Sequence, residues 1–177
     1  MSTRGLIGYR TTKERDTTNN VFGIYNHYDS YFTGKGLDIL EIYNNNSKEN
    51  FIDMFKSKTW ESEEICRVED TLSIFSLNEE NLFNQSDFLL DGLFCEYAYI
   101  YNIQTDELEV YETIKNKPYF KNQPKDDLNY YLSLAFIVNR KNVFFILNLF
   151  YHSLDLGNDT LIKMYMKESK GIINGMK

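Results

Sequence analysis

The chain has 177 residues, of which 42% are hydrophobic, 16% aromatic and 25% charged, and its formal net charge is −7. With only 2 prolines and 9 glycines, this composition excludes a disordered or low-complexity protein and predicts one globular domain over residues 1–177. The acidic balance argues against a broad nucleic-acid-binding surface, because such a surface needs an excess of lysine and arginine to contact phosphates.

The cysteines and histidines are not spaced like the ligands of a metal site. Cys66 and Cys95 lie far apart, and neither has a histidine close by in the sequence. We therefore predict two buried or half-buried thiols in a reducing cytosol, with no metal and no cofactor. The most apolar stretch, Leu132–Phe150, is interrupted by polar residues, so we expect a soluble cytoplasmic protein without a secretory signal or a membrane span.

The first half of the chain predicts a hairpin followed by helices. Its expected elements are strands over Leu6–Arg10 and Val21–Tyr28, a turn at Gly34 and Gly36, and helices over Leu37–Tyr43 and Lys48–Lys58. The polar link between the two strands favours antiparallel pairing, and Ser47 is a favourable N-cap for the second helix. The acidic stretch that follows allows a strand around Leu72–Phe75 and a short helix around Glu79–Phe83.

The second half predicts another hairpin, a further strand and two helices. The expected strands are Phe94–Ile103, Leu108–Ile114 and Leu128–Val138, and the expected helices are Asn142–Leu154 and Thr160–Ser169. Nearly every position of 142–154 is apolar, so a strand and a buried helix both fit, and the length favours the helix. This order of elements predicts an α+β fold with a mainly antiparallel sheet built from two hairpins and helices packed on it.

Two stretches resemble a known family. They are the opening Met1–Arg10 with Tyr25-Asn26-His27-Tyr28-Asp29-Ser30-Tyr31 after it, and the run from Phe94 to Glu112 that contains Glu96-Tyr97-Ala98-Tyr99. They resemble small uncharacterised proteins of phage and cellular genomes that carry a Thr-Arg-Gly strand, a Tyr-Asn-His-x-Asp-Ser-Tyr segment and a later Glu-x-Ala-Tyr hairpin. The match covers about a third of the chain, and Phe32 stands where that family has a proline. The resemblance implies an α+β fold and a phage or mobile-element origin, and it brings no reaction with it.

The densest polar cluster follows the second strand, at Asn26–Ser30. His27 titrates near neutrality and is a candidate general base, and Asp29 shares its face if the strand continues. The alternative is an Asx-turn, in which Asp29 and Ser30 bond the turn backbone while His27 packs on tyrosines. The binding residues expected in this cluster are Tyr25, Asn26 and Tyr28.

Three further residues complete the candidate catalytic and binding set. Arg4 and Glu96 each begin an apolar strand, so we expect Arg4 to pair with Glu96, or with Asp29, if the hairpins adjoin. Ser2 gives the sharpest enzymatic hypothesis, because loss of Met1 leaves a free α-amine beside a hydroxyl, as in N-terminal-nucleophile hydrolases.

Two classes of function follow. The favoured one is a small acidic binding protein that inhibits a basic, nucleic-acid-handling host defence complex in the manner of anti-CRISPR proteins. It would act in the host cytoplasm by protein contact, without binding nucleic acid or a membrane itself. Its acidic contact residues would be Glu63, Glu64, Glu69 and Asp70. The alternative is a small hydrolase or nucleotide-processing enzyme that uses Ser2 or a His27/Asp29 site.

Overall fold

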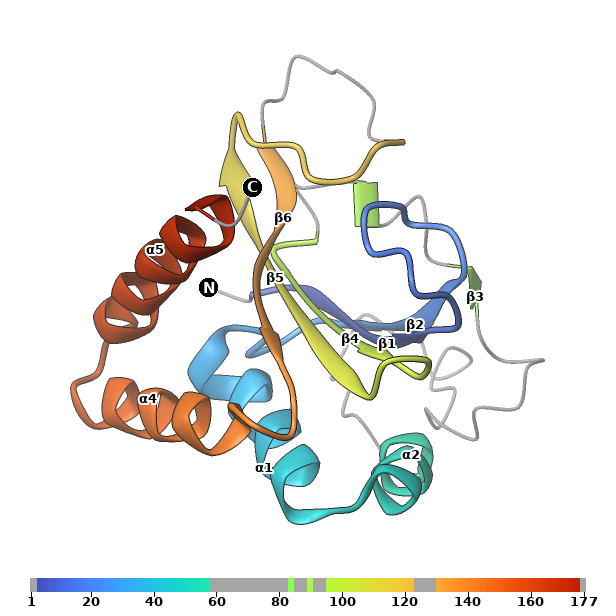
Figure 1. Cartoon of the computed structure of the whole chain (residues 1–177), viewed down its shortest axis with the longest axis horizontal. Coiled ribbons are helices and arrows are strands. Elements are labelled where there is room, and N and C mark those ends of the chain that lie inside the picture. The colour runs from blue at the N-terminus through green and yellow to red at the C-terminus, as the bar shows by residue number, and fades with distance from the viewer. Residues whose placement is uncertain (1–2, 58–82, 85–88, 91–94, 123–129, 176–177) are drawn as a thin grey trace.

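The computed structural model describes residues 3–57, 83–84, 89–90, 95–122 and 130–175, and it is built around one six-stranded sheet (Figure 1). The strands are Gly5–Arg10 (β1), Val21–Asn26 (β2), Phe83–Asn84 (β3), Tyr97–Asn102 (β4), Glu107–Lys115 (β5) and Tyr130–Val138 (β6). Their order is β3-β2-β1-β4-β5-β6. Among these neighbours only β1 and β4 run parallel. The predicted α+β fold with a mainly antiparallel sheet is confirmed.

The helices begin close to where their sequence signals predict. They are a π-helical turn over Phe32–Gly36 (η1), α1 over Leu37–Asn45, α2 over Lys48–Ser57, α4 over Val143–Asp155 and α5 over Thr160–Gly175. The ambiguous run 142–154 is helical, as its length favours. Ser47 caps α2, because its Oγ accepts the backbone N–H of Asn50 at 3.4 Å.

Several boundaries differ from prediction. α5 continues to Gly175 rather than ending at Ser169, and β4 begins at Tyr97 rather than at Phe94. β2 ends at Asn26 rather than Tyr28, because the side chain of Asn26 bonds the turn that follows it. Phe83 was predicted to end a short helix, but it pairs with Gly23 in the short edge strand β3. The strand predicted around Leu72–Phe75, and residues 79–82 of that helix, lie outside the described residues.

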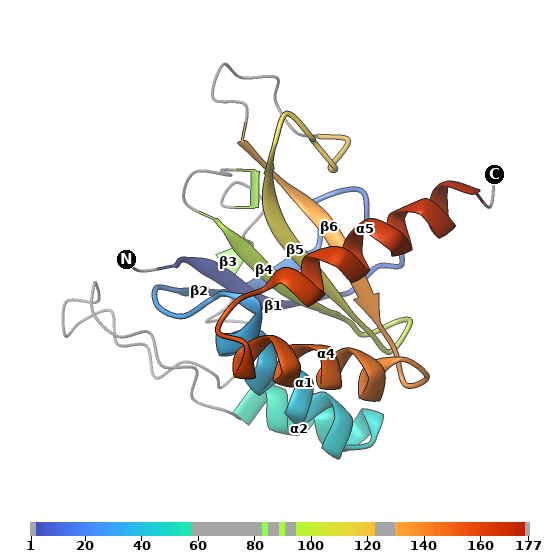
Figure 2. The same cartoon turned by 90° about the vertical axis from the view of Figure 1, so that its left-hand side faces the viewer.

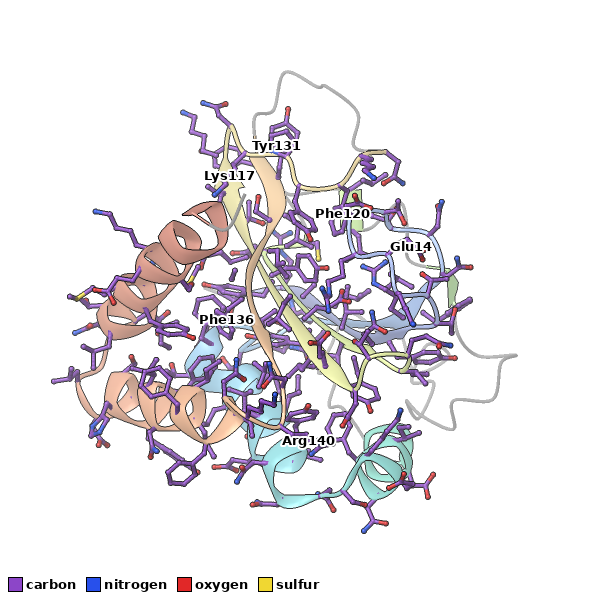
Figure 3. The ribbon with its side chains drawn as sticks, in the orientation of Figure 1. Glu14, Lys117, Phe120, Tyr131, Phe136 and Arg140 are labelled. Atoms are coloured by element: carbon purple, nitrogen blue, oxygen red, sulfur yellow. The ribbon has the colours of Figure 1, made fainter. Side chains whose placement is uncertain are left out.

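The larger core lies between the sheet and the helices. The side chains of Tyr99 and Tyr101, two residues apart in β4, point to this same face. They are buried in one cluster with side chains of α1 and α4. Phe32 of η1 joins the layers, with its ring 5.8 Å from the rings of both Phe136 and Phe150. Figure 3 shows Phe136 between the sheet and the helices. A smaller core on the opposite face contains Ala98, Ile100, Tyr111, Leu132 and Phe120.

Arg140, in the turn between β6 and α4, contacts the β4–β5 turn and the C-terminal end of α1 (Figure 3). Its guanidinium lies 3.9 Å from the centre of the Tyr43 ring in α1 and pairs with Asp106 in the β4–β5 turn at 3.1 Å. It also donates to the carbonyl oxygens of Tyr43 and Asn46 at 2.5 and 2.6 Å. These carbonyls lie at the C-terminal end of α1, where a cation is favoured by the helix dipole.

No helix within the described residues combines the length and the apolar composition that crossing a bilayer requires.

Candidate functional site

The predicted site residues of the two hairpins meet at one end of the sheet, where β1 and β4 begin and β2 ends. Gly5 of β1 is paired with Asn26 of β2 and with Tyr97 of β4. The carbonyl oxygen of Arg4 accepts the backbone N–H of Glu96 at 3.0 Å, and Nε of Arg4 lies 3.4 Å from Oε1 of Glu96. The two hairpins therefore adjoin, and the predicted Arg4–Glu96 ion pair is present.

His27 and Asp29 lie beyond the strand. Because β2 ends at Asn26 and Asp29 has a φ of 53°, the strand does not continue through them, so the condition under which both side chains would share one face is not met. A turn replaces it: Nδ2 of Asn26 donates to Oγ of Ser30 at 2.7 Å and also to the carbonyl of Tyr28. The ring of His27 packs edge-on against Tyr28, with 4.3 Å between the ring centres.

Hydrogen bonds with Thr3, Tyr99 and Tyr31 hold this turn in place. The backbone N–H of Ser30 donates to the carbonyl of Thr3, before β1, at 3.3 Å. The carbonyl of Ser30 accepts the hydroxyl of Tyr99 at 2.8 Å. Burial and the hydrogen bond to the Asp29 carboxylate both raise the pKa of Tyr31. At neutral pH this phenol stays protonated and acts as a donor that fixes the carboxylate.

Two buried polar atoms at this end of the sheet have no hydrogen-bond partner within the described part of the chain. They are Oδ1 of Asn26 and Oγ1 of Thr3. A buried acceptor or hydroxyl without a partner is uncommon, and each such group needs an explanation. Ser2, the residue next to Thr3, lies outside the described residues.

The acidic contact residues predicted from sequence, Glu63, Glu64, Glu69 and Asp70, also lie outside the described residues. So does Cys66, whereas Cys95 is buried, with its Sγ 3.4 Å from the carbonyl oxygen of Tyr97. The described residues contain as many acidic as basic side chains, so the net charge of −7 comes from the remaining segments. Within the described residues, no three His, Cys, Asp or Glu side chains are grouped so that they could hold a metal ion.

A second surface, not predicted from the sequence, is formed by α4 and α5. Figure 2 shows α4 across the front of the molecule, with α5 rising from it and no described element in front of either. Large apolar side chains project from this surface, which we call the α4–α5 face; they are Phe144, Phe145, Tyr151, Leu154, Leu156 and Met164. Phe144 is 68% exposed and Leu156 is 61% exposed, values that are high for side chains of this kind.

Part of this face is held in a fixed orientation. Phe145 of α4 packs edge-on against Tyr165 of α5, with ring centres 5.3 Å apart. The hydroxyl of Tyr151 donates to the carboxylate of Glu41 in α1. The opposite side of α4 is buried in the core through Val143, Ile146, Leu147 and Phe150. α4 therefore carries large apolar side chains on its exposed side as well as on its buried side.

Comparisons of the chain with protein-family models, curated proteins and solved structures found no match.

The two surfaces differ in what they can do. The sheet end offers an imidazole, carboxylates and phenol donors, and its charges are already paired or bonded within the turn. The α4–α5 face offers preformed apolar contact area, with aromatic side chains and a methionine of the kinds that are enriched where proteins bind one another.

Proposed function

We propose that this protein is a binding protein that acts through contact between its surface and a macromolecular partner. The observation that carries the proposal is the α4–α5 face, where Phe144 in the first turn of α4 and Leu156 at its C-terminal end are both more than half exposed. Large apolar areas on a protein surface mark interaction sites. Because Phe145 and Tyr151 are already held by neighbours, a partner would order few of these side chains on binding.

The finer proposal concerns the partner. A basic, nucleic-acid-handling host defence complex, inhibited in the manner of anti-CRISPR proteins, fits the net charge of −7 and the resemblance to phage-encoded proteins. Opposite charges steer and strengthen such an encounter, and added salt screens them. The acidic residues concerned, Glu63, Glu64, Glu69 and Asp70, lie within a stretch rich in carboxylates.

The test is capture of partners from host lysate by the tagged full chain at low and high salt, with mass spectrometry of what is retained. A Phe144→Ser/Leu156→Ser variant removes the two most exposed apolar side chains of the face. Tyr130→Ser is the matched control, because Tyr130 is 43% exposed on β6, away from this face. Circular dichroism checks that each variant is folded.

We expect one partner to be retained by the wild type and by Tyr130→Ser and lost by the double variant. Equal capture by all three proteins would contradict a role for the face. A basic nucleoprotein that is retained at low salt and released at high salt would support the finer proposal. A partner whose capture does not depend on salt would overturn it.

The second candidate is a hydrolase with Ser2 as its N-terminal nucleophile. It is favoured by the buried Oδ1 of Asn26 and Oγ1 of Thr3, which lack partners among the described residues at the start of β1. N-terminal nucleophiles begin a strand and use their own α-amine as base. Intact mass would show whether Met1 is removed, and a fluorophosphonate probe would report a reactive serine, with Ser2→Ala as control. A retained Met1, or labelling that Ser2→Ala leaves unchanged, would exclude this candidate.

A further inference from the structure

The exposed side of α4 carries a regular stripe of side chains. Lys141, in the turn before the helix, is followed by Phe144, Asn148, Tyr151 and Asp155, all of them exposed. Within α4, the residues Phe144, Asn148, Tyr151 and Asp155 are spaced by four, three and four positions, which is the spacing of the contact seam between two paired helices, and Lys141 precedes them in the turn. We call these five residues the α4 seam. The core positions of the same helix lie on its other side, so the seam is a second, outward contact surface.

The α4 seam is complementary to itself in one orientation. When two copies run antiparallel about an axis at Asn148, Lys141 of each copy lies opposite Asp155 of the other. Phe144 then lies opposite Tyr151, and the positions match to within one residue, about 1.5 Å along the helix. A parallel arrangement would instead place like charges together at both ends, which is unfavourable. An unrelated partner would have no reason to match this palindromic order of charge, aromatic ring and amide.

From this order we infer that the occupant of the α4 seam is a second copy of this chain, paired antiparallel through α4. The inference rests on the proposed function, because it takes the α4–α5 face to be a docking surface and names its occupant. Asn148 lies at the centre, where a polar residue in a seam fixes the register of the two helices. Two Lys141–Asp155 pairs, one at each end, fix their direction.

The α4 seam is short. α4 has 13 residues, a length of about 20 Å. Such a contact lies at the small end of protein interfaces, even with Leu156 and Met164 beside it. A contact of this size is typical of weak, transient complexes, so we expect a concentration-dependent equilibrium between monomer and dimer.

Sedimentation velocity of the full chain over a wide concentration series tests the inference. Lys141→Asp and Asp155→Lys each place like charges at both ends of the pair. Each is expected to raise the Kd about tenfold or more, because every substitution enters the symmetric contact twice. Lys13→Asp, a charge reversal of an exposed residue in the β1–β2 loop, is the control and is expected to leave the Kd unchanged.

Exchanging the two charges, Lys141 and Asp155, tests whether they pair with each other across the dimer. The Lys141→Asp/Asp155→Lys double variant is expected to recover the Kd to within about threefold of the wild type, since each pair is restored with its sign inverted. An equimolar mixture of the two single variants is also expected to form a heterodimer, because one supplies two acidic ends and the other two basic ends. Circular dichroism confirms folding of each variant.

The results separate this inference from the proposed function. A wild type that stays monomeric at every concentration overturns the inference, as does a dimer insensitive to both single reversals and to Phe144→Ser. If the wild type stays monomeric while Phe144→Ser/Leu156→Ser loses a captured partner, the proposed function stands and the inference fails. If the charge-exchange pattern appears and no partner is captured, the inference stands and binding to another macromolecule is excluded.

Discussion

Replacing Glu109 by glutamine tests what holds the sheet together. Arg10 and Glu109 form an ion pair with both side chains fully buried and 3.1 Å between Nε and Oε2. The same oxygen accepts the hydroxyl of Tyr111 at 2.7 Å, and Oε1 accepts Nδ2 of Asn102 at 3.0 Å. Glu109→Gln keeps the volume of the side chain, removes its charge and replaces one acceptor oxygen by a donor.

The expected cost is large because the Arg10 charge remains buried without its carboxylate. Removing one partner of a buried pair lowers the free energy of unfolding by about 3–5 kcal/mol. For a domain whose stability is about 5–15 kcal/mol, this is a third or more of the total. Replacing both residues, as in Arg10→Met/Glu109→Leu, removes both charges together. This double variant is expected to recover at least half of the loss.

Urea unfolding followed by far-ultraviolet circular dichroism at neutral pH measures these differences. The matched control is Glu96→Gln, which breaks the Arg4–Glu96 pair, whose side chains are 28% and 34% exposed. Its expected cost is below about 1 kcal/mol, because water screens an exposed pair. If Glu109→Gln cost no more than Glu96→Gln, the reasoning that burial sets the strength of these pairs would be refuted.

Three further predictions concern single positions. Arg140→Lys loses the planar fork that bonds Asp106 and two carbonyls of α1, and we expect a loss of about 1–2 kcal/mol in urea unfolding. Gly36→Ala places a Cβ 2.6 Å from the buried hydroxyl of Tyr99, so we expect a lower midpoint of thermal unfolding than for the wild type. An unchanged midpoint would contradict this. Burial raises the pKa of Asp159, so the folded state holds this proton more tightly than the unfolded state does. Its contribution to stability is therefore present below pH about 4 and lost as the pH rises through the raised pKa. Asp159→Asn removes the titratable group and is expected to be more stable than the wild type at pH 7 and not at pH 3, which unfolding at the two pH values measures.

Local patterns in the sequence predict most of the elements, whereas the pairing between distant segments is only partly predictable. The two hairpins follow from alternation and polar turns, and they are present. The parallel pairing of β1 with β4 joins residues about 90 positions apart, as in Gly5 and Tyr97, and no local pattern encodes it. The charged residues before these two strands, Arg4 and Glu96, gave the one indication of this pairing in the sequence, because each charge needed a partner.

The prediction that the second strand extends past Asn26 was wrong for a local reason. The His27–Asp29 argument assumed that the strand continued, but the side chain of Asn26 bonds Ser30 and the carbonyl of Tyr28 instead. Short polar side chains compete with strand pairing in this way. The buried Arg10–Glu109 pair was missed because a charged residue in a strand is normally expected at the surface.

The ambiguity of the run 142–154 has a structural cause. An amphipathic helix on a core needs one apolar side, and a helix that is apolar all round is expected to be buried all round. The fold buries Val143, Ile146, Leu147 and Phe150, which accounts for one side and leaves Phe144 and Tyr151 facing water. Pairing of the α4 seam with a second copy would account for the other side.

Self-pairing also bears on how the protein would bind a partner. A dimer carries two copies of a chain of charge −7, and two linked binding events strengthen avidity by about 10²–10⁴ when both engage at once. Lys141→Asp is therefore expected to lower retention of a basic partner in the capture assay although it adds negative charge, and mixing it with Asp155→Lys is expected to restore retention. If Lys141→Asp were retained as well as the wild type, each copy would bind its partner alone. The α4 seam would then have no part in binding the partner.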